Sequence, residues 1–170
     1  MDTALELDLE EDVAFLHSFG DVSDYELERG KPMPSFNHSI IQSNLIVALA
    51  KHKKYFRVAS ELSLKLPTMK ATPDVCLYAQ RKADFRNDQI TVAEAPLLVI
   101  EIISPSQTTT STFKKFDRYF ENGVHSCWLV QPELQSITVV HPTGKPHTAD
   151  AGMLEDSALG IAIQVEEVFE

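Results

Sequence analysis

Cysteine is scarce in this sequence, with Cys76 and Cys127 as the two thiols among 170 residues. They lie in separate apolar runs, and neither belongs to a CxxC motif or a cysteine–histidine cluster, which argues against a disulfide or a zinc site. We therefore expect both thiols to be reduced and packed in a hydrophobic core. The chain also lacks any apolar run near the roughly 18 residues that a membrane-spanning helix needs.

Basic residues are missing from both ends of the chain. All 15 lysines and arginines lie between Arg29 and Lys145, a stretch with 9 acidic residues and a net charge of +6. The flanks hold 16 acids and no lysine or arginine. Because the acidic start lacks the basic segment of a signal peptide, we expect a cytoplasmic protein. The mildly basic body can meet a phosphate backbone, although only weakly.

The length and an apolar fraction of 44% fit one domain over residues 1–170 with a substantial core. Helical spacing of apolar residues predicts helices over 38–53 and 112–122, and alternation predicts a half-exposed strand over 56–66. The unbroken apolar run 97–103 indicates a strand covered on both faces. This order predicts an α/β fold with a central mixed sheet flanked by helices. We further expect a partly frayed acidic segment over 1–20, a helix near 10–18, a polar loop over 81–91, and strands at 74–78, 127–130, 137–140 and 161–165.

Glu101 stands inside that apolar strand, between Ile100 and Ile102. An ionised carboxylate in such surroundings costs several kcal/mol unless it is paired, hydrogen-bonded or bound to a metal. The position is therefore compatible with a salt bridge to a cation on a neighbouring helix, with a protonated carboxyl group, or with a metal ligand.

Asp74 follows Pro73 at the start of the preceding predicted strand. Taken alone, it fits an ordinary aspartate at a turn or strand start. If the two strands are neighbours, the carboxylates of Asp74 and Glu101 converge at one end of the sheet. Two hard oxygen ligands in that arrangement suit Mg²⁺ or Mn²⁺.

Lys114 and Lys115 lie on the predicted helix that follows the Glu101 strand. A metal site that hydrolyses phosphodiesters also needs a positive group near the attacking water and the developing charge. Both lysines flank the phenylalanine stripe of this helix at similar angles, so periodicity does not choose between them. Two solvated lysines explain the pattern equally well.

These residues together resemble the PD-(D/E)XK nuclease superfamily and, within it, the Uma-type family of proteins classed as restriction endonucleases. The resemblance covers nearly all of the chain, and its most specific part is the segment 96–106 together with 115–132. Its marks here are Tyr25-Glu26-Leu27 with Gly30, His38 at a helix start, Pro73-Asp74-Val75, the run from Pro96 to Ser106, Lys115 with Tyr119, Gly123-Val124, and the run from Trp128 to Pro132.

The resemblance implies a restriction-endonuclease-like fold whose metal ligands match Asp74, Glu101 and the carbonyl group of Ile102. The superfamily usually carries a lysine two residues after the glutamate, where this chain has Ile103. The family shows the same departure, and its helical lysine, which matches Lys115, is taken as the substitute.

Three accessory positions also follow from the resemblance or from the helix pattern. Glu26 matches an early glutamate of the family that orients the site or a water, although an exposed turn acid is an equally good interpretation. His38 and Gln42 lie one turn apart on the first predicted helix and could face the site, whereas capping or packing explains His38 equally well. The family usually has an acid where this chain has Ser111, and aspartate where it has Gln131.

The sequence therefore predicts a Mg²⁺- or Mn²⁺-dependent endonuclease that hydrolyses DNA phosphodiesters, with Asp74, Glu101, Lys115 and Glu26 as catalytic residues. We expect a homodimer, because nucleases that cut both strands often pair, an argument by analogy. The alternative is a catalytically inactive nuclease-fold module that binds nucleic acid or a protein partner. The missing lysine of the core motif and the lack of an obvious DNA-reading segment favour that alternative. A structural partner in a toxin or mobile-element system is a third interpretation, for which the sequence carries no mark.

Overall fold

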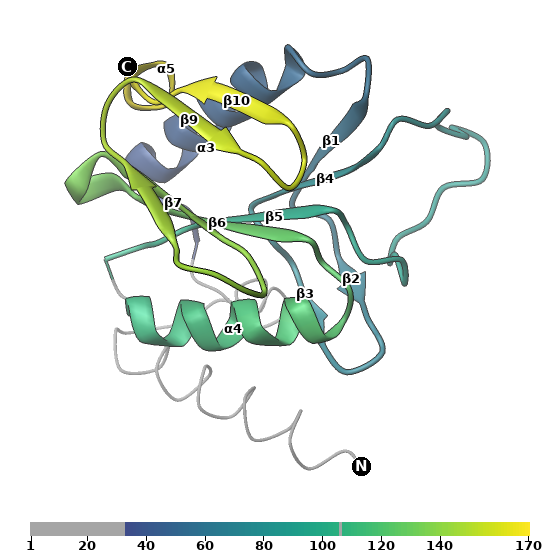
Figure 1. Cartoon of the computed structure of the whole chain (residues 1–170). Helices are drawn as coiled ribbons and strands as arrows, with labels where there is room; N and C mark the ends of the chain where they lie inside the picture. Colours follow the sequence, from purple (N-terminus) through teal and green to yellow (C-terminus); the bar gives the residue numbers. More distant parts are fainter. Residues whose placement is uncertain (1–32, 106) are drawn as a thin grey trace.

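A computed structural model describes residues 33–105 and 107–170 of the chain. Its centre is a six-stranded mixed sheet (Figure 1), made of β1 (Phe56–Ser60), β4 (Val75–Ala79), β5 (Leu98–Ile102), β6 (Ser126–Gln131), β7 (Ser136–Val140) and β8 (His147–Ala149). The strands follow the order β1-β4-β5-β6-β7-β8. β5 and β6 are parallel, and the other neighbouring pairs are antiparallel. β4, which Asp74 directly precedes, and β5, which carries Glu101, are neighbours, the condition under which the two carboxylates converge.

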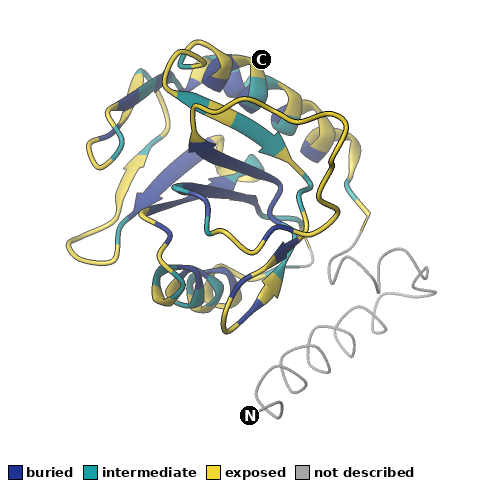
Figure 2. Cartoon of the chain, turned by 90° about the vertical axis from the view of Figure 1, so that its right-hand side faces the viewer, coloured by how far each residue is buried: buried dark blue, intermediate teal, exposed yellow. Residues whose placement is uncertain are grey.

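Helices and short hairpins cover both faces of this sheet, which confirms the predicted layering (Figure 1). One face carries α3 (Phe36–Ala50), α5 (Glu166–Phe169) and the hairpin of β9 (Met153–Asp156) and β10 (Ile161–Gln164). The other carries α4 (Thr109–Glu121) and the hairpin of β2 (Leu64–Lys65) and β3 (Lys70–Ala71). The short 3₁₀ helix η1 (Pro132–Leu134) joins β6 to β7. Figure 2 shows the buried strands between layers whose outer surfaces are exposed.

β5 shows no alternation because both of its faces meet a hydrophobic layer. Val99 packs in the core on the α4 face, while Ile100 packs in the core on the α3 face. The helix that returns the chain to the parallel strand β6 begins at Thr109, earlier than the predicted residue 112, because the Thr108 side chain accepts a hydrogen bond from the Ser111 N–H. It ends at Glu121, and Gly123 follows with φ +94, a conformation that favours glycine.

The strand predicted over residues 56–66 is confirmed only over Phe56–Ser60. The chain forms β1 up to Ser60, adopts a left-handed conformation at Glu61 (φ +52), and pairs again only in β2. Alternation continued across the break and concealed it, because Leu62 and Leu64 keep the phase of Phe56 and Val58. The predicted tail strand is present as β10, whereas β8 and β9 were not foreseen.

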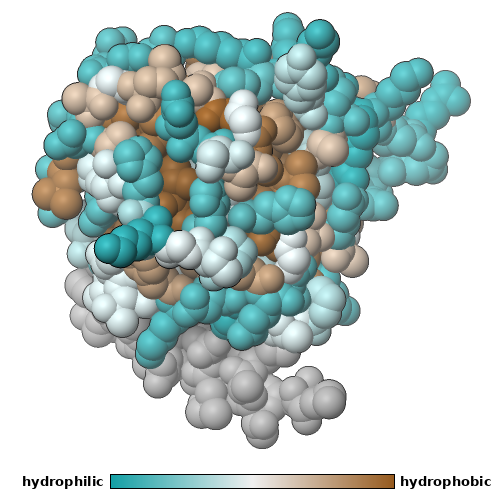
Figure 3. Space-filling view, viewed as in Figure 1, coloured by the Kyte–Doolittle hydropathy of each residue, from teal (hydrophilic) through white to brown (hydrophobic). Residues whose placement is uncertain are grey.

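The polar stretch 81–91 contains neither helix nor strand, as predicted. It belongs to the loop that projects from the body between β4 and β5, and its surface is largely hydrophilic (Figures 1 and 3). Within residues 33–105 and 107–170, no helix is long and apolar enough to cross a bilayer. The predicted acidic segment 1–20 and the helix near 10–18 lie outside the described residues.

Asp156 links the β9–β10 hairpin to the central sheet through its buried carboxylate. Its buried Oδ2 accepts hydrogen bonds from the Ser126 hydroxyl and, at 2.8 Å, from the Trp128 indole N–H of β6. Its Oδ1 lies 2.9 Å from Nε2 of His141, just after β7. Charged acceptors in such buried networks contribute more to stability than neutral ones do.

Replacing Asp156 by alanine should lower the free energy of unfolding by about 3 kcal/mol, because the buried donors of β6 lose their acceptor. Urea denaturation followed by far-ultraviolet circular dichroism measures the change. The exposed Asp150 provides a matched control, and Asp150→Ala should leave the midpoint nearly unchanged. Equal midpoints for the two variants would contradict the fastening role of Asp156.

Candidate functional site

The register between β4 and β5 brings the two predicted carboxylates to the same edge of the sheet. Val75 pairs with Ile100 in these antiparallel strands, so Asp74, one residue before β4, lies at the level of Glu101. Side chains alternate along a strand. Cys76, two residues after Asp74, belongs to the core on the α4 face, as does the β5 residue two positions before Glu101. Both carboxylates therefore leave their strands toward the same face.

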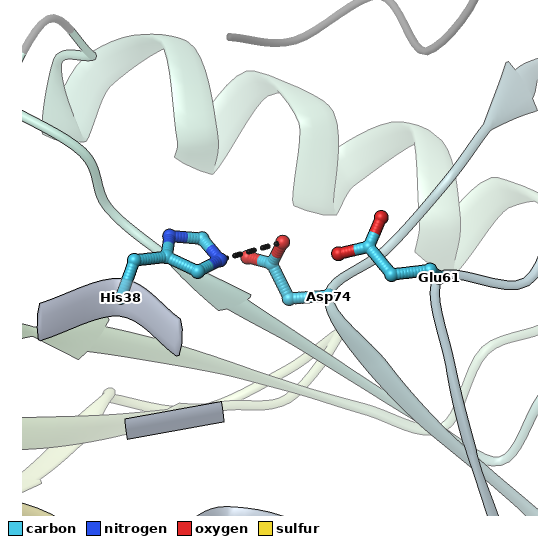
Figure 4. A group of neighbouring side chains, drawn as sticks. All are labelled: His38, Glu61 and Asp74. Atoms are coloured by element: carbon cyan, nitrogen blue, oxygen red, sulfur yellow. Dashed lines mark ion pairs between the residues drawn. The ribbon is translucent and has the colours of Figure 1, made fainter. Parts of the chain in front are cut away.

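The buried Asp74 side chain links β4, β5 and α3. Its Oδ2 accepts a hydrogen bond from the Ile102 N–H at 2.7 Å. Its Oδ1 lies 3.2 Å from Nε2 of His38, which sits in the first turn of α3 (Figure 4). One turn later on the same helix, the Gln42 side-chain amide donates to the Asp74 carbonyl oxygen at 2.9 Å. The structure thus places both accessory residues of α3 beside Asp74.

The Glu101 carboxylate is paired with a lysine and a tyrosine of α4, on the face of the sheet away from α3. The Lys115 Nζ of α4 lies 2.8 Å from Oε1 of Glu101, and the Tyr119 hydroxyl donates to the same oxygen at 3.0 Å. Residues four apart on a helix share one face, which explains why Lys115 and Tyr119 reach the same carboxylate. Lys114 is exposed instead. The structure therefore distinguishes the two lysines that helical periodicity left equivalent.

The negative charge of Glu101 also acts on the buried groups around it. Burial first, and then this charge, raise the pKa of the Cys76 thiol to about 12. The same two causes raise the pKa of Tyr119 well above its usual value, so its hydroxyl keeps the proton that it donates. Burial likewise raises the pKa of Cys127. Both cysteines are free and buried, as predicted.

Glu61 joins the site, although the sequence pattern placed it on the exposed side of a strand. Its N–H donates to the Asp74 carbonyl oxygen at 3.2 Å, and its Oε1 accepts from the Gln42 amide at 3.3 Å. One ligand atom each of His38, Glu61 and Asp74 lies within 4.8 Å of the other two (Figure 4). The signal that could have revealed Glu61 is Ser60, a polar residue where the alternation requires an apolar one.

The roles predicted for the Ile102 carbonyl group and for Glu26 stay predictions. Ile102 supplies the N–H that binds Asp74, whereas a ligand role for its carbonyl group stays a prediction. Glu26 lies outside the described residues. A hollow of about 450 Å³ adjoins the site and extends from the start of α3 to the loop before α4 and to η1. Its wall includes His38, Ile103 and Thr109, so His38 both lines this accessible space and contacts Asp74.

The sequence is similar to a described family over most of its length. The profile of the Uma2 family, described as "Putative restriction endonuclease", matches residues 19–166. Among solved structures, the fold resembles that of a "putative nuclease" from Anabaena variabilis, with a TM-score of 0.70 and 22% sequence identity. The match covers 81% of this chain and 83% of the other, and at this identity it shows a shared fold. No curated protein matches the chain.

The raised pKa values make the two thiols unreactive in the folded protein, because only the thiolate attacks disulfide reagents. With Cys76 at a pKa of about 12, its thiolate fraction at neutral to mildly alkaline pH is negligible. An aromatic disulfide reagent should therefore label neither thiol in the native protein and both after unfolding in guanidinium. Rapid labelling of protein with unchanged circular dichroism would contradict the burial of Cys76 beneath Glu101.

Proposed function

The chain belongs to the Uma2 family, and from this premise we propose that it is a divalent-cation-dependent endonuclease that hydrolyses DNA phosphodiester bonds. The observation that carries the proposal is the pair of buried carboxylates, Asp74 and Glu101, at one edge of the sheet with Lys115 against Glu101. A buried ion pair is weak evidence for stability, since packed apolar residues serve as well. Chemistry at this edge explains the arrangement better than stability does.

The donor groups fit Mg²⁺ or Mn²⁺. Both cations prefer oxygen ligands, and Mg²⁺ commonly uses one or two carboxylates and keeps several waters. Asp74, Glu101 and the Ile102 carbonyl would hold the cation. When bound, it supplies a Lewis acid that offsets the negative charge developing on the phosphoryl oxygens. Since His38 lines the accessible hollow and contacts Asp74, we place the approaching phosphodiester in that hollow.

Lys115 supplies the protein's own positive charge to the reaction. Its ammonium donates up to three hydrogen bonds, so it can hold Glu101 and also orient the attacking water or contact a phosphoryl oxygen. Its side chain is 32% exposed, which leaves it accessible from solvent. Tyr119 is a positioning residue, because it holds the carboxylate that Lys115 contacts. Glu26, His38 and Gln42 are proposed as accessory residues that orient the site or a water.

The distribution of charge along the sequence supports a nucleic-acid substrate. The stretch from Arg29 to Lys145 has a net charge of +6, which favours contact with a phosphate backbone. A duplex has two strands of opposite direction, and two copies of one site meet them symmetrically in a homodimer. We therefore include a homodimer in the proposal for double-strand cleavage.

A plasmid nicking assay with Mg²⁺ or Mn²⁺ tests the proposal by comparing variants of the neighbouring lysines Lys114 and Lys115. Lys115→Met should reduce the nicking rate at least about 100-fold, because it removes a preorganised positive charge next to the reacting group. Asp74→Asn should cause a loss of at least the same order. The control is Lys114→Met, which removes an equal charge from an exposed position and should cut at nearly the wild-type rate.

Thermal melts of each variant separate loss of activity from loss of fold. Equal rates for Lys115→Met and Lys114→Met would refute the role given to Lys115. Absence of cleavage by the wild-type chain with either cation, on DNA and RNA alike, would refute the nuclease proposal and leave the inactive binding module.

A further inference from the structure

A second group of ligand atoms lies on the side of Asp74 that faces α3. Nε2 of His38 and carboxylate oxygens of Glu61 and Asp74 lie within 4.8 Å of one another. These atoms come from the first turn of α3, the turn after β1, and the residue before β4 (Figure 4). Groups from three separate elements meet here, and one nitrogen and two oxygens form a ligand set of a kind that proteins use for divalent transition metals.

Nε2 of the His38 imidazole lies in this group without a hydrogen bond to any described residue. Its side chain is 9% exposed, and Nε2 has no hydrogen-bond partner among the described residues, although Oδ1 of Asp74 is only 3.2 Å away. The direction of the ring nitrogen therefore does not match a hydrogen bond to that oxygen. A buried polar atom without a hydrogen bond costs free energy. A cation lying between the ring and both carboxylates gives this nitrogen a partner.

Hydrogen bonds from Gln42 and Glu61 hold the Glu61 carboxylate and the backbone of Asp74 in place. The Gln42 amide donates to Glu61 Oε1 and to the Asp74 carbonyl oxygen, and the Glu61 N–H donates to that same carbonyl. The left-handed backbone of Glu61 turns the chain out of β1 at this point. Hydrogen bonds that orient ligand side chains from outside commonly accompany metal sites. Gln42 fills that place here.

We propose that His38, Glu61 and Asp74 form a second cation position, distinct from the one between Asp74 and Glu101. It takes a divalent transition metal such as Mn²⁺ in preference to Mg²⁺, because an imidazole nitrogen suits transition metals whereas Mg²⁺ prefers an all-oxygen shell. This second position goes beyond the proposed function, with which it shares Asp74 as a ligand and the accessory residues His38 and Gln42.

Mn²⁺ binding to the metal-free full-length chain tests the second position. Electron paramagnetic resonance gives the number of bound ions, and electron spin echo modulation detects coupling from an imidazole nitrogen. We expect a bound Mn²⁺ with nitrogen coupling that excess Mg²⁺ does not displace. Glu61→Gln removes one of the three proposed ligands and should weaken Mn²⁺ binding at this position by at least about tenfold, since loss of an outer-shell partner alone commonly costs about that much.

Histidine variants assign the nitrogen coupling. His38→Gln should abolish it, whereas His125→Gln, which changes an exposed histidine, should leave it intact. Glu101→Gln should also leave it intact while weakening the other position. Bound Mn²⁺ without nitrogen coupling, or coupling that survives His38→Gln, would overturn the inference.

The outcome is separable from the proposed function. Nicking activity together with absent nitrogen coupling would refute the second position and leave the nuclease standing. Nitrogen-coupled Mn²⁺ in a chain that cuts no nucleic acid would support the second position and refute the nuclease.

Discussion

The register of β4 against β5 is the constraint on which the site depends. It sets Asp74 at the level of Glu101 and directs both side chains to the α4 face of a sheet that is otherwise apolar on both sides. Two adjacent negative charges in such surroundings require compensation. Lys115 of α4 supplies it at Glu101, and the Ile102 N–H of β5 donates to the Asp74 carboxylate.

This compensation explains features that look incidental when taken one at a time. Tyr119 is fully buried, and its hydroxyl donates a hydrogen bond to Glu101. Gln42 links Glu61 to the strand that carries Asp74. A core built for stability alone does better with apolar side chains at these places. We therefore interpret the retained polar network as the cost of the cation-binding edge proposed above.

Much of this arrangement could be predicted from the sequence where periodicity is strong. The apolar run around Glu101 predicted a strand covered on both faces, and the break at Pro73 located the start of the Asp74 strand. Glu61 escaped prediction because its left-handed conformation depends on contacts with Asp74, which alternation does not encode. The choice between Lys114 and Lys115 depends on how α4 is rotated against the sheet, so it too required the tertiary structure.

A crystal structure of the chain soaked in Mn²⁺, with anomalous diffraction data, locates the cation relative to Asp74 and Glu101. We expect an anomalous peak in contact with the carboxylates of both Asp74 and Glu101, near the Lys115 amine. A crystal with Mn²⁺ bound elsewhere, and no peak at these two carboxylates, would contradict this expectation.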